Sequence, residues 1–390
     1  MKRIGLFLSA GPLEGGMFQY GHAILAALRA LPTEEYSLVT AYADPAWRER
    51  VQDCDGFSFP VKLGRLTNGL AMLSAVLPIS YRRWGEMVTG VCGWADDLLR
   101  QACDLWIFPR QDVWSALFPA PVLAAVHDLM HRYEPNFPET SNYGRTRYRD
   151  AYLRRVCQRA SGILVDSEMG KRQVQESYGT EAERLFVLPY IAPAYLSEAG
   201  SDADFEKKYR LPAKYVFYPA QFWEHKNHVR LIHAIAQLRK DIPDICLVLA
   251  GAEKNSGSAA RREVDRLHLQ QHIRFAGYVP ENDMAGFYRG ARALVLPTLF
   301  GPTNIPPLEA FAMGCPVAVS GIYGMPEQVG DAGLLFDPYS VESIASSIRQ
   351  LWLGDDLCLK LRDKGRQRAA AWGPSQFAAA LHRVIRQLTN

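Results

Sequence analysis

The stretch from Leu296 to Val317 carries an acid where it can bind a ligand. An apolar, strand-like run ends here in a loop with free backbone amides, and a helix begins at Pro306 and Pro307. Glu309 falls in the first turns of that helix. Its charge can simply complement the helix dipole, or its two oxygens can hold a ribose diol through charge-assisted hydrogen bonds. The sequence leaves both roles open.

Lys226 lies in a loop that follows another strand-like run, 214–218, and precedes a predicted helix. A lysine beside the amides of a helix start gives a diphosphate one positive charge and several hydrogen-bond donors. A solvated surface lysine is the alternative interpretation.

His127 stands at the predicted carboxyl end of a buried strand, 121–126, where open α/β sheets present ligand-binding groups. A strand-end histidine without a role is one alternative, and a zinc pair with His131 is another. The zinc-protease motif needs a helix and a glutamate after the first histidine, whereas a strand precedes His127 and Asp128 follows it. A metal site is therefore disfavoured.

Glycines follow the first predicted strand at Gly11, Gly15, Gly16 and Gly21. Without side chains in the way, backbone N–H groups and the N-terminus of the following helix can approach a phosphate. The spacing is not the G-x-G-x-x-G of dinucleotide-binding proteins, so a plain tight turn is an equally good interpretation.

The elements that must position these residues follow an α/β pattern. Short runs rich in Val, Ile, Leu and Phe alternate with amphipathic, helix-length segments, which is typical of buried parallel strands joined by helices. This predicts two doubly wound sheets. The expected strands are 3–9, 36–42, 104–108, 121–126, 162–166 and 184–188, then 214–218, 245–250, 273–276, 292–297 and 315–319.

Pro189 and Pro193, followed by the polar stretch Ser197–Asp204, indicate a linker between two domains, with a cleft beside it. Ser375 is expected to cap a last helix. The expected domains are 1–195, 205–372 and a C-terminal helical segment, 373–390, with helices at 340–353, 356–371 and 376–388.

The composition excludes several classes of protein. The 390 residues, 48% of them hydrophobic, can bury two cores, and a net charge of +3 is too small to indicate a nucleic-acid partner. Seven widely spaced cysteines without a C-x-x-C pair predict reduced thiols, a cytoplasmic location and no zinc cluster. The apolar start, Met1–Ser9, is too short for a signal peptide, and no stretch is long enough to span a bilayer.

Together these motifs resemble the nucleotide-sugar glycosyltransferases of the GT-B fold, specifically the large retaining family 4. The resemblance covers almost the whole chain and is strongest at Pro306–Ala310, Gly314–Val317 and the Gly-x-Pro-Glu of Gly324–Glu327. It implies two Rossmann-like domains that face each other across a cleft, with a C-terminal helix that packs back on the first domain.

The resemblance also implies a role for each motif. Gly15 and Gly16 lie near the donor diphosphate, and His127 points at the transferred sugar. Lys226 clamps the phosphates, and Glu309 holds the nucleotide ribose. Further donor contacts are expected from Gln221, Tyr278, Val279, Thr303, Asn304 and Ile305. No metal or other cofactor is expected.

Two positions depart from the family's pattern. Gly301, eight residues before Glu309, stands where the family has another glutamate, so a carboxylate contact to the donor sugar is missing. Gln221, five residues before Lys226, stands where arginine is usual, so one phosphate charge is missing. The sequence Phe300–Asn304 nevertheless resembles a known variant of the loop.

The expected activity is transfer of a hexose or deoxyhexose, such as mannose or rhamnose, to a glycan hydroxyl with retention of configuration, in bacterial surface polysaccharide (O-antigen or exopolysaccharide) assembly. A lipid-linked acceptor at the membrane surface fits Tyr81–Trp84 and a basic cluster, although a solvated arginine helix explains the cluster equally well. The cluster comprises Arg145, Arg147, Arg149, Arg154, Arg155 and Arg159. A non-catalytic glycan- or nucleotide-binding protein and a nicotinamide-dependent dehydrogenase are the rival functions, and the absence of G-x-G-x-x-G argues against the second.

Overall fold

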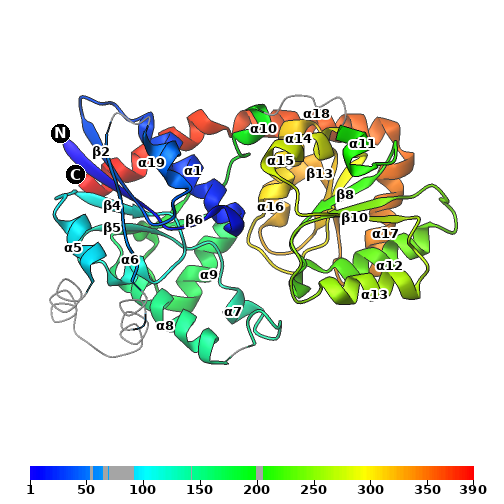
Figure 1. Cartoon of the computed structure of the whole chain (residues 1–390), viewed down its shortest axis with the longest axis horizontal. Coiled ribbons are helices and arrows are strands. Elements are labelled where there is room, and N and C mark those ends of the chain that lie inside the picture. Colours follow the sequence, from blue (N-terminus) through cyan, green and yellow to red (C-terminus); the bar gives the residue numbers. More distant parts are fainter. Residues whose placement is uncertain (53–55, 65–68, 70–91, 142, 199–204) are drawn as a thin grey trace. The chain divides into compact units, whose positions relative to one another are not determined.

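The chain folds into two compact units, each built on one parallel sheet (Figure 1). The computed structural model describes residues 1–52, 56–64, 69, 92–141, 143–198 and 205–390. The first unit comprises 1–135, 140–190 and 374–390, and the second comprises 136–139 and 191–373. Tyr81–Trp84 and most of the predicted linker, Ser197–Asp204, lie outside the described residues.

Seven strands form the sheet of the first unit, in the order β3-β2-β1-β4-β5-β6-β7. All residues of β4, β5 and β6 are buried, as hydrophobic strands covered on both faces require. The strands are β1 (Lys2–Leu8), β2 (Tyr36–Tyr42), β3 (Phe57–Pro60), β4 (Leu105–Phe108), β5 (Val122–Ala125), β6 (Gly162–Val165) and β7 (Leu185–Val187). The helices include α1 (Gly16–Arg29), α2 (Trp47–Gln52), α5 (Gly93–Leu99), α6 (Trp114–Leu117), α7 (Met130–Tyr133), α8 (Tyr143–Arg159), α9 (Glu168–Tyr178) and α19 (Pro374–Thr389).

Six strands form the sheet of the second unit, in the order β10-β9-β8-β11-β12-β13. They are β8 (Val216–Pro219), β9 (Leu247–Ala250), β10 (Ile273–Gly277), β11 (Ala293–Leu296), β12 (Val317–Ser320) and β13 (Gly333–Phe336). The helices include α10 (Tyr195–Glu198), α11 (Phe205–Tyr209), α12 (His228–Leu238), α13 (Gly257–Arg266), α14 (Glu281–Gly290), α15 (Ile305–Met313), α16 (Met325–Val329), α17 (Val341–Leu353) and α18 (Asp355–Ala371).

The strand order of each sheet reverses once, between β1 and β4 in the first unit and between β8 and β11 in the second. Open α/β sheets bind their ligands at such switch points, beyond the carboxyl ends of the strands. The loops after these four strands are therefore the places where a site is expected.

The last helix, α19, packs on the first unit, as expected for the C-terminal segment (Figure 1). The ring of Phe377 meets the ring of Tyr20 of α1 edge-on, with 6.2 Å between the ring centres. The Lys2 ammonium donates to the carbonyl of Thr389 over 2.5 Å. The last helix thus packs against α1, and its C-terminal end reaches the start of β1.

The structure corrects several expected boundaries. Two strands were not predicted, β3 and β13, because both are short edge strands with exposed residues. α1 begins at Gly16, inside the loop that was expected to continue to Gly21. α19 begins at Pro374, so Ser375 lies in its first turn and does not cap it; proline is favoured at a helix start because its missing N–H would be unpaired there.

Candidate functional site

Two loops of the second unit meet at the switch point of its sheet. One follows β8 and carries Lys226, and the other follows β11 and carries Asn304. The Lys226 ammonium donates to the side-chain oxygen of Asn304 over 3.1 Å, although 78 residues separate the two in the sequence. The fold therefore brings two of the predicted site residues together at the switch point, where open α/β sheets usually bind their ligands.

Asn227 holds the Lys226 loop against its neighbours. Its backbone is left-handed, with φ of 62°, and its side-chain amide donates to the carbonyls of Pro297, over 2.9 Å, and Pro338, over 2.8 Å. The Tyr218 hydroxyl donates to the Lys226 carbonyl over 2.8 Å. Asn227 was not among the predicted site residues; the available signal is an asparagine just before a helix, because asparagine tolerates this conformation.

Asn304 is fixed by Gln328 at the start of α15. Its N–H donates to the Gln328 side-chain oxygen over 3.0 Å, and the Gln328 amide donates back to the Asn304 carbonyl over 2.7 Å. Pro306 and Pro307 have no N–H, so Ile305 carries the one backbone donor among the first three residues of the helix. A helix N-terminus attracts anions. The Ile305 N–H thus directly follows Asn304, whose side chain meets the Lys226 ammonium and whose backbone is held by Gln328.

Gly301 has a backbone that excludes the glutamate expected from the resemblance. Its φ is 138°, which side-chain-bearing residues rarely adopt. A Cβ at this position would lie 2.7 Å from Nδ2 of Asn304 and 3.3 Å from the carbonyl oxygen of Thr303. The missing carboxylate is therefore a consequence of the path of this loop.

We expect Gly301→Glu to damage the site instead of restoring a carboxylate. Strain at this backbone costs about 1–3 kcal/mol of stability, and the displaced Asn304 no longer meets Lys226. Thermal unfolding and calorimetric titration with nucleoside diphosphates measure both effects. Gly301→Ala is the matched control, since it brings the strain without the charge. A glutamate variant that melts at the wild-type temperature and binds more tightly contradicts this account.

Glu309, the fifth residue of α15, is 6% exposed and is bound by two tyrosines. The Tyr195 hydroxyl donates to its Oε1 and the Tyr288 hydroxyl to its Oε2, both over 2.5 Å. Burial raises the pKa of this carboxyl, and the two hydroxyl bonds act in the opposite direction. Each carboxylate oxygen has a further lone pair, so Glu309 can still accept two hydroxyls. It is a buried, oriented acid and more than a complement to the helix dipole.

Gln221, Tyr278 and Val279 lie on two further loops of the second unit. Gln221 follows β8, beside the switch point, and its side-chain oxygen accepts a hydrogen bond from the Trp223 indole over 2.9 Å. Tyr278 and Val279 follow β10, the edge strand two places from β8. Tyr278 is exposed and Val279 is buried. Gln221 is therefore the nearer of these residues to the switch point along the sheet.

In the first unit, His127 follows β5, and both of its ring nitrogens are hydrogen-bonded. Nε2 lies 2.7 Å from the Pro109 carbonyl, which can only accept, so Nε2 carries the proton. Nδ1 then accepts from the Tyr190 hydroxyl over 2.7 Å. Burial is the main cause that lowers the pKa of His127 to about 4. His127 is therefore a neutral imidazole with a fixed tautomer at physiological pH.

Gln111 fixes the backbone at this strand end. Its side-chain oxygen accepts from the N–H groups of His127, over 2.6 Å, and Asp128, over 2.9 Å. Its side-chain nitrogen donates to the Asp128 carbonyl over 2.8 Å. Gln111 was not predicted, because a single glutamine after a strand carries no distinctive signal.

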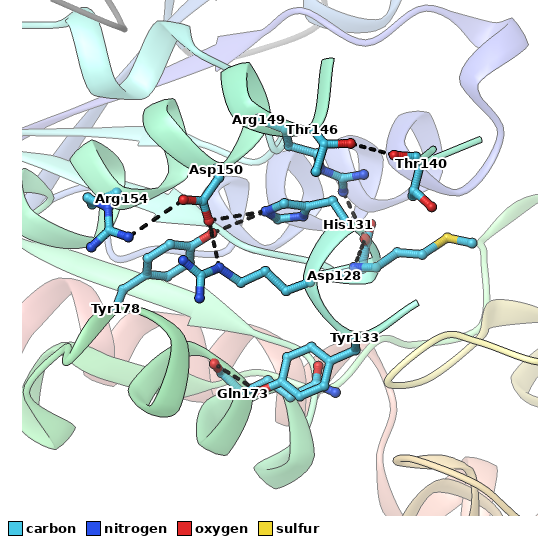
Figure 2. A network of polar contacts seen from close by, with 12 residues as sticks. Asp128, His131, Tyr133, Thr140, Thr146, Arg149, Asp150, Arg154, Gln173 and Tyr178 are labelled. Carbon is cyan, nitrogen blue, oxygen red and sulfur yellow. Dashed lines mark hydrogen bonds and ion pairs between the residues drawn. The ribbon is translucent and has the colours of Figure 1, made fainter. Parts of the chain in front are cut away.

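His131 does not form a metal pair with His127. It lies in the short helix α7, and its Nε2 is 3.3 Å from the Tyr178 hydroxyl and 3.6 Å from Asp150 (Figure 2). Within the described part of the chain, no group of three or more histidine, cysteine, aspartate or glutamate side chains could hold a metal ion.

Two arginines of the predicted basic cluster form ion pairs inside the first unit (Figure 2). Arg149 of α8 donates to Asp128 over 2.8 Å, and Arg154 lies 3.6 Å from Asp150. Asp150 also accepts from Arg132 over 2.6 Å. The pairs of Arg132 with Asp150 and of Arg149 with Asp128 tie α7 and the residue stretch before it to α8, whereas the pair of Arg154 with Asp150 lies within α8.

The glycine-rich loop follows β1 at the switch point of the first sheet. Gly15 has φ of 56°, and α1 begins at the next residue, Gly16. Nothing lies within 4 Å of a Cβ placed at Gly15. Arg110 is paired with Glu14 over 2.8 Å beside it. Among the described residues, the space beside Gly15 at the start of this 14-residue helix is therefore open, which suits a loop that binds a phosphate.

Among the helices in the described ranges, none combines the length and apolar character that a bilayer span needs.

Comparison with known proteins points to one class of enzyme. The family described as glycosyl transferases group 1 matches residues 201–368. O-antigen chain mannosyltransferase B of Escherichia coli is 29% identical over 220 residues, which are 55% of this chain and 57% of that protein. D-inositol 3-phosphate glycosyltransferase of Corynebacterium aurimucosum is 26% identical over 319 residues, which are 76% of this chain and 69% of that protein. The chain thus matches little more than half of the length of the first of these relatives.

The fold is also found in a solved structure. HepE of Anabaena, crystallised in complex with UDP and glucose, has a TM-score of 0.75 to this chain, and the match covers 99% of this chain and 100% of that one. At 15% identity this likeness concerns the fold alone. With two parallel-sheet α/β units, that fold is GT-B.

Proposed function

We propose that this chain transfers a hexose or deoxyhexose from a nucleoside diphosphate sugar to a glycan hydroxyl. It is a glycosyltransferase of the GT-B fold, and its residues 201–368 match the group 1 family. The meeting of Lys226 with the Asn304 loop at the switch point of the second sheet carries this proposal. A cation and a helix-start N–H side by side suit a diphosphate. The buried Glu309 on the same helix suits the diol of a ribose.

The chemistry that we propose proceeds with retention of configuration. The bond between the anomeric carbon and the diphosphate oxygen breaks while the acceptor oxygen attacks the same face of the sugar. The departing phosphate oxygen takes the acceptor proton, so no protein base is needed. Lys226 and the Ile305 N–H stabilise the charge that develops on the diphosphate. His127, with its two nitrogens occupied, acts by shape and polarity near the sugar.

We further propose that the sugar is mannose or a related hexose and that the acceptor is a lipid-linked glycan of a surface polysaccharide, at the cytoplasmic face of the membrane. The mannosyltransferase of O-antigen chains among the relatives supports the sugar and the pathway class. The basic character of α8 supports an anionic carrier.

A thermal-shift screen of the whole chain against GDP, UDP, dTDP, ADP and their common sugars tests the proposal. A ligand at one hundred times its dissociation constant stabilises the folded state by about 2.7 kcal/mol, or about 5–10 °C for a unit of this size. We expect one nucleoside diphosphate to give such a shift. If no nucleotide shifts the melting temperature, the donor site at Lys226 and Glu309 is wrong.

A non-catalytic GT-B protein that has kept the nucleotide cleft is the second candidate function, because Gly301 and Gln221 remove two charged donor contacts expected in the family. Such a protein binds a nucleotide sugar without consuming it. Release of the free nucleoside diphosphate from a bound nucleotide sugar, with or without an acceptor, excludes this candidate.

A further inference from the structure

Two tyrosines lie on either side of one point at which the chain passes between the units, and each binds a predicted site residue. Tyr190 belongs to the first unit, and its hydroxyl lies 2.7 Å from Nδ1 of His127. Tyr195 belongs to the second unit, and its hydroxyl lies 2.5 Å from Oε1 of Glu309. Each bond lies within its own unit. The two site residues are therefore held by side chains only five positions apart in the sequence.

The segment between the tyrosines is short and partly rigid. Five residue steps of fully extended chain span at most about 18 Å between Cα atoms. Pro193 lies inside the segment and fixes its own φ. A change in a backbone dihedral angle within 191–194 is therefore compensated within a few residues, or it moves the ring of Tyr190 or Tyr195.

The ring of Tyr190 is packed in an aromatic cluster around His127. Tyr20 of α1 meets the Tyr190 ring at 5.3 Å and the His127 ring at 5.0 Å, both edge-on. Tyr20 also meets Phe377, which lies just after the chain re-enters the first unit at Pro374. Packed rings of this kind occupy discrete positions, so any movement of the Tyr190 ring changes its contact with His127.

We propose that Tyr190 and Tyr195 are a pair of positioning residues that couple the His127 ring of one unit to the Glu309 carboxylate of the other through the segment between them. The inference rests on the proposed function, which gives each of these two groups a role in the reaction. A ribose diol that binds the second lone pair of each Glu309 oxygen shares Oε1 with the Tyr195 hydroxyl and reorients that bond, so donor binding shifts the segment and, through Tyr190, His127.

The first experiment needs no ligand. Histidine imidazoles are labelled with ¹⁵N in the full chain, and the His127 signal is assigned from its loss in His127→Gln. Tyr190→Phe moves this signal directly, because it removes the donor to Nδ1. We expect Tyr195→Phe to move it as well. Tyr288→Phe is the matched control, because it removes the other hydroxyl from the same carboxylate but lies on α14. A His127 signal that is unchanged in Tyr195→Phe, or changed equally in Tyr288→Phe, overturns the coupling.

The second experiment is a double-mutant cycle on sugar transfer with the donor found by the thermal-shift screen. We expect Tyr195→Phe to raise the donor KM and Tyr190→Phe to lower kcat, each by about tenfold. The effect of the double variant at Tyr190 and Tyr195 should differ from the product of the two single effects by more than threefold. The effect of the double variant at Tyr190 and Tyr288 should equal the product of its single effects to within about twofold. Multiplicative behaviour of both pairs overturns the inference and leaves the proposed function intact. If the wild type transfers no sugar, the proposed function fails, and the imidazole signals still decide the coupling.

Discussion

Replacement of Lys226 with alanine is expected to lower kcat/KM for the nucleotide sugar by about 30- to 900-fold, equivalent to the 2–4 kcal/mol that one preorganised charge donor supplies to a transition state. The effect should be this large because Gln221 stands where a second cation is usual. The Lys226 ammonium is also held in place, by Asn304 at its tip and by Tyr218 and Asn227 around its backbone.

Steady-state transfer kinetics measure this effect, and two variants serve as controls. Lys360→Ala removes an exposed lysine of α18 and should leave the kinetics unchanged. Asn304→Ala removes only the acceptor that orients the ammonium and should cost less than Lys226→Ala. Unchanged turnover in Lys226→Ala removes the lysine from the mechanism.

Replacement of Glu309 with glutamine is expected to weaken nucleoside diphosphate binding by about 10- to 100-fold. The carboxylate can accept two ribose hydroxyls in charge-assisted bonds, each worth about 1.5–3 kcal/mol, and the amide loses the charge and one of the two acceptor oxygens. Calorimetric titration measures the loss. A matched nucleotide without ribose hydroxyls should lose little affinity on this change, and an equal loss for both nucleotides contradicts a contact between Glu309 and the ribose.

The same substitution is expected to stabilise the unliganded protein above neutral pH. Burial holds the pKa of Glu309 above its value in the unfolded chain, so ionisation favours the unfolded state. This penalty is absent below the unfolded pKa of about 4.3, grows as the pH rises from there toward the folded pKa and is constant above it. Glu309→Gln should therefore melt above the wild type at pH 8, and the difference should vanish as the pH falls to the unfolded pKa. A difference that grows on acidification contradicts the direction of the shift.

The elements that carry the site could be predicted because hydrophobic burial dictates them. Runs such as Leu105–Phe108 and Val122–Ala125 are buried on both faces, and their composition alone predicts parallel strands. Lys226 and Asn304 could each be placed at a strand end. Their meeting followed from the strand order, which puts β8 beside β11.

The partners of the site residues could not be predicted, because they come from distant parts of the chain. Nothing in the sequence pairs Tyr195 with Glu309 or Gln328 with Asn304, since those bonds depend on tertiary packing. The short edge strands β3 and β13 were not predicted, because their half-exposed sequences carry little hydrophobic signal. The predicted start of α19 was wrong, because the helix begins at a proline in the first helical position and not after a serine cap.

The place of α19 in the first unit has a consequence for how the protein is made. Domains commonly fold in the order in which they leave the ribosome, the N-terminal one first. Here the first unit needs Phe377 and the rest of α19 to cover α1, whereas the second unit is complete by Gly373. During translation the later unit therefore finishes first, and α1 keeps part of its apolar face uncovered until the last helix emerges. A nascent chain that stops short of Phe377 holds a finished second unit attached to an unfinished first one.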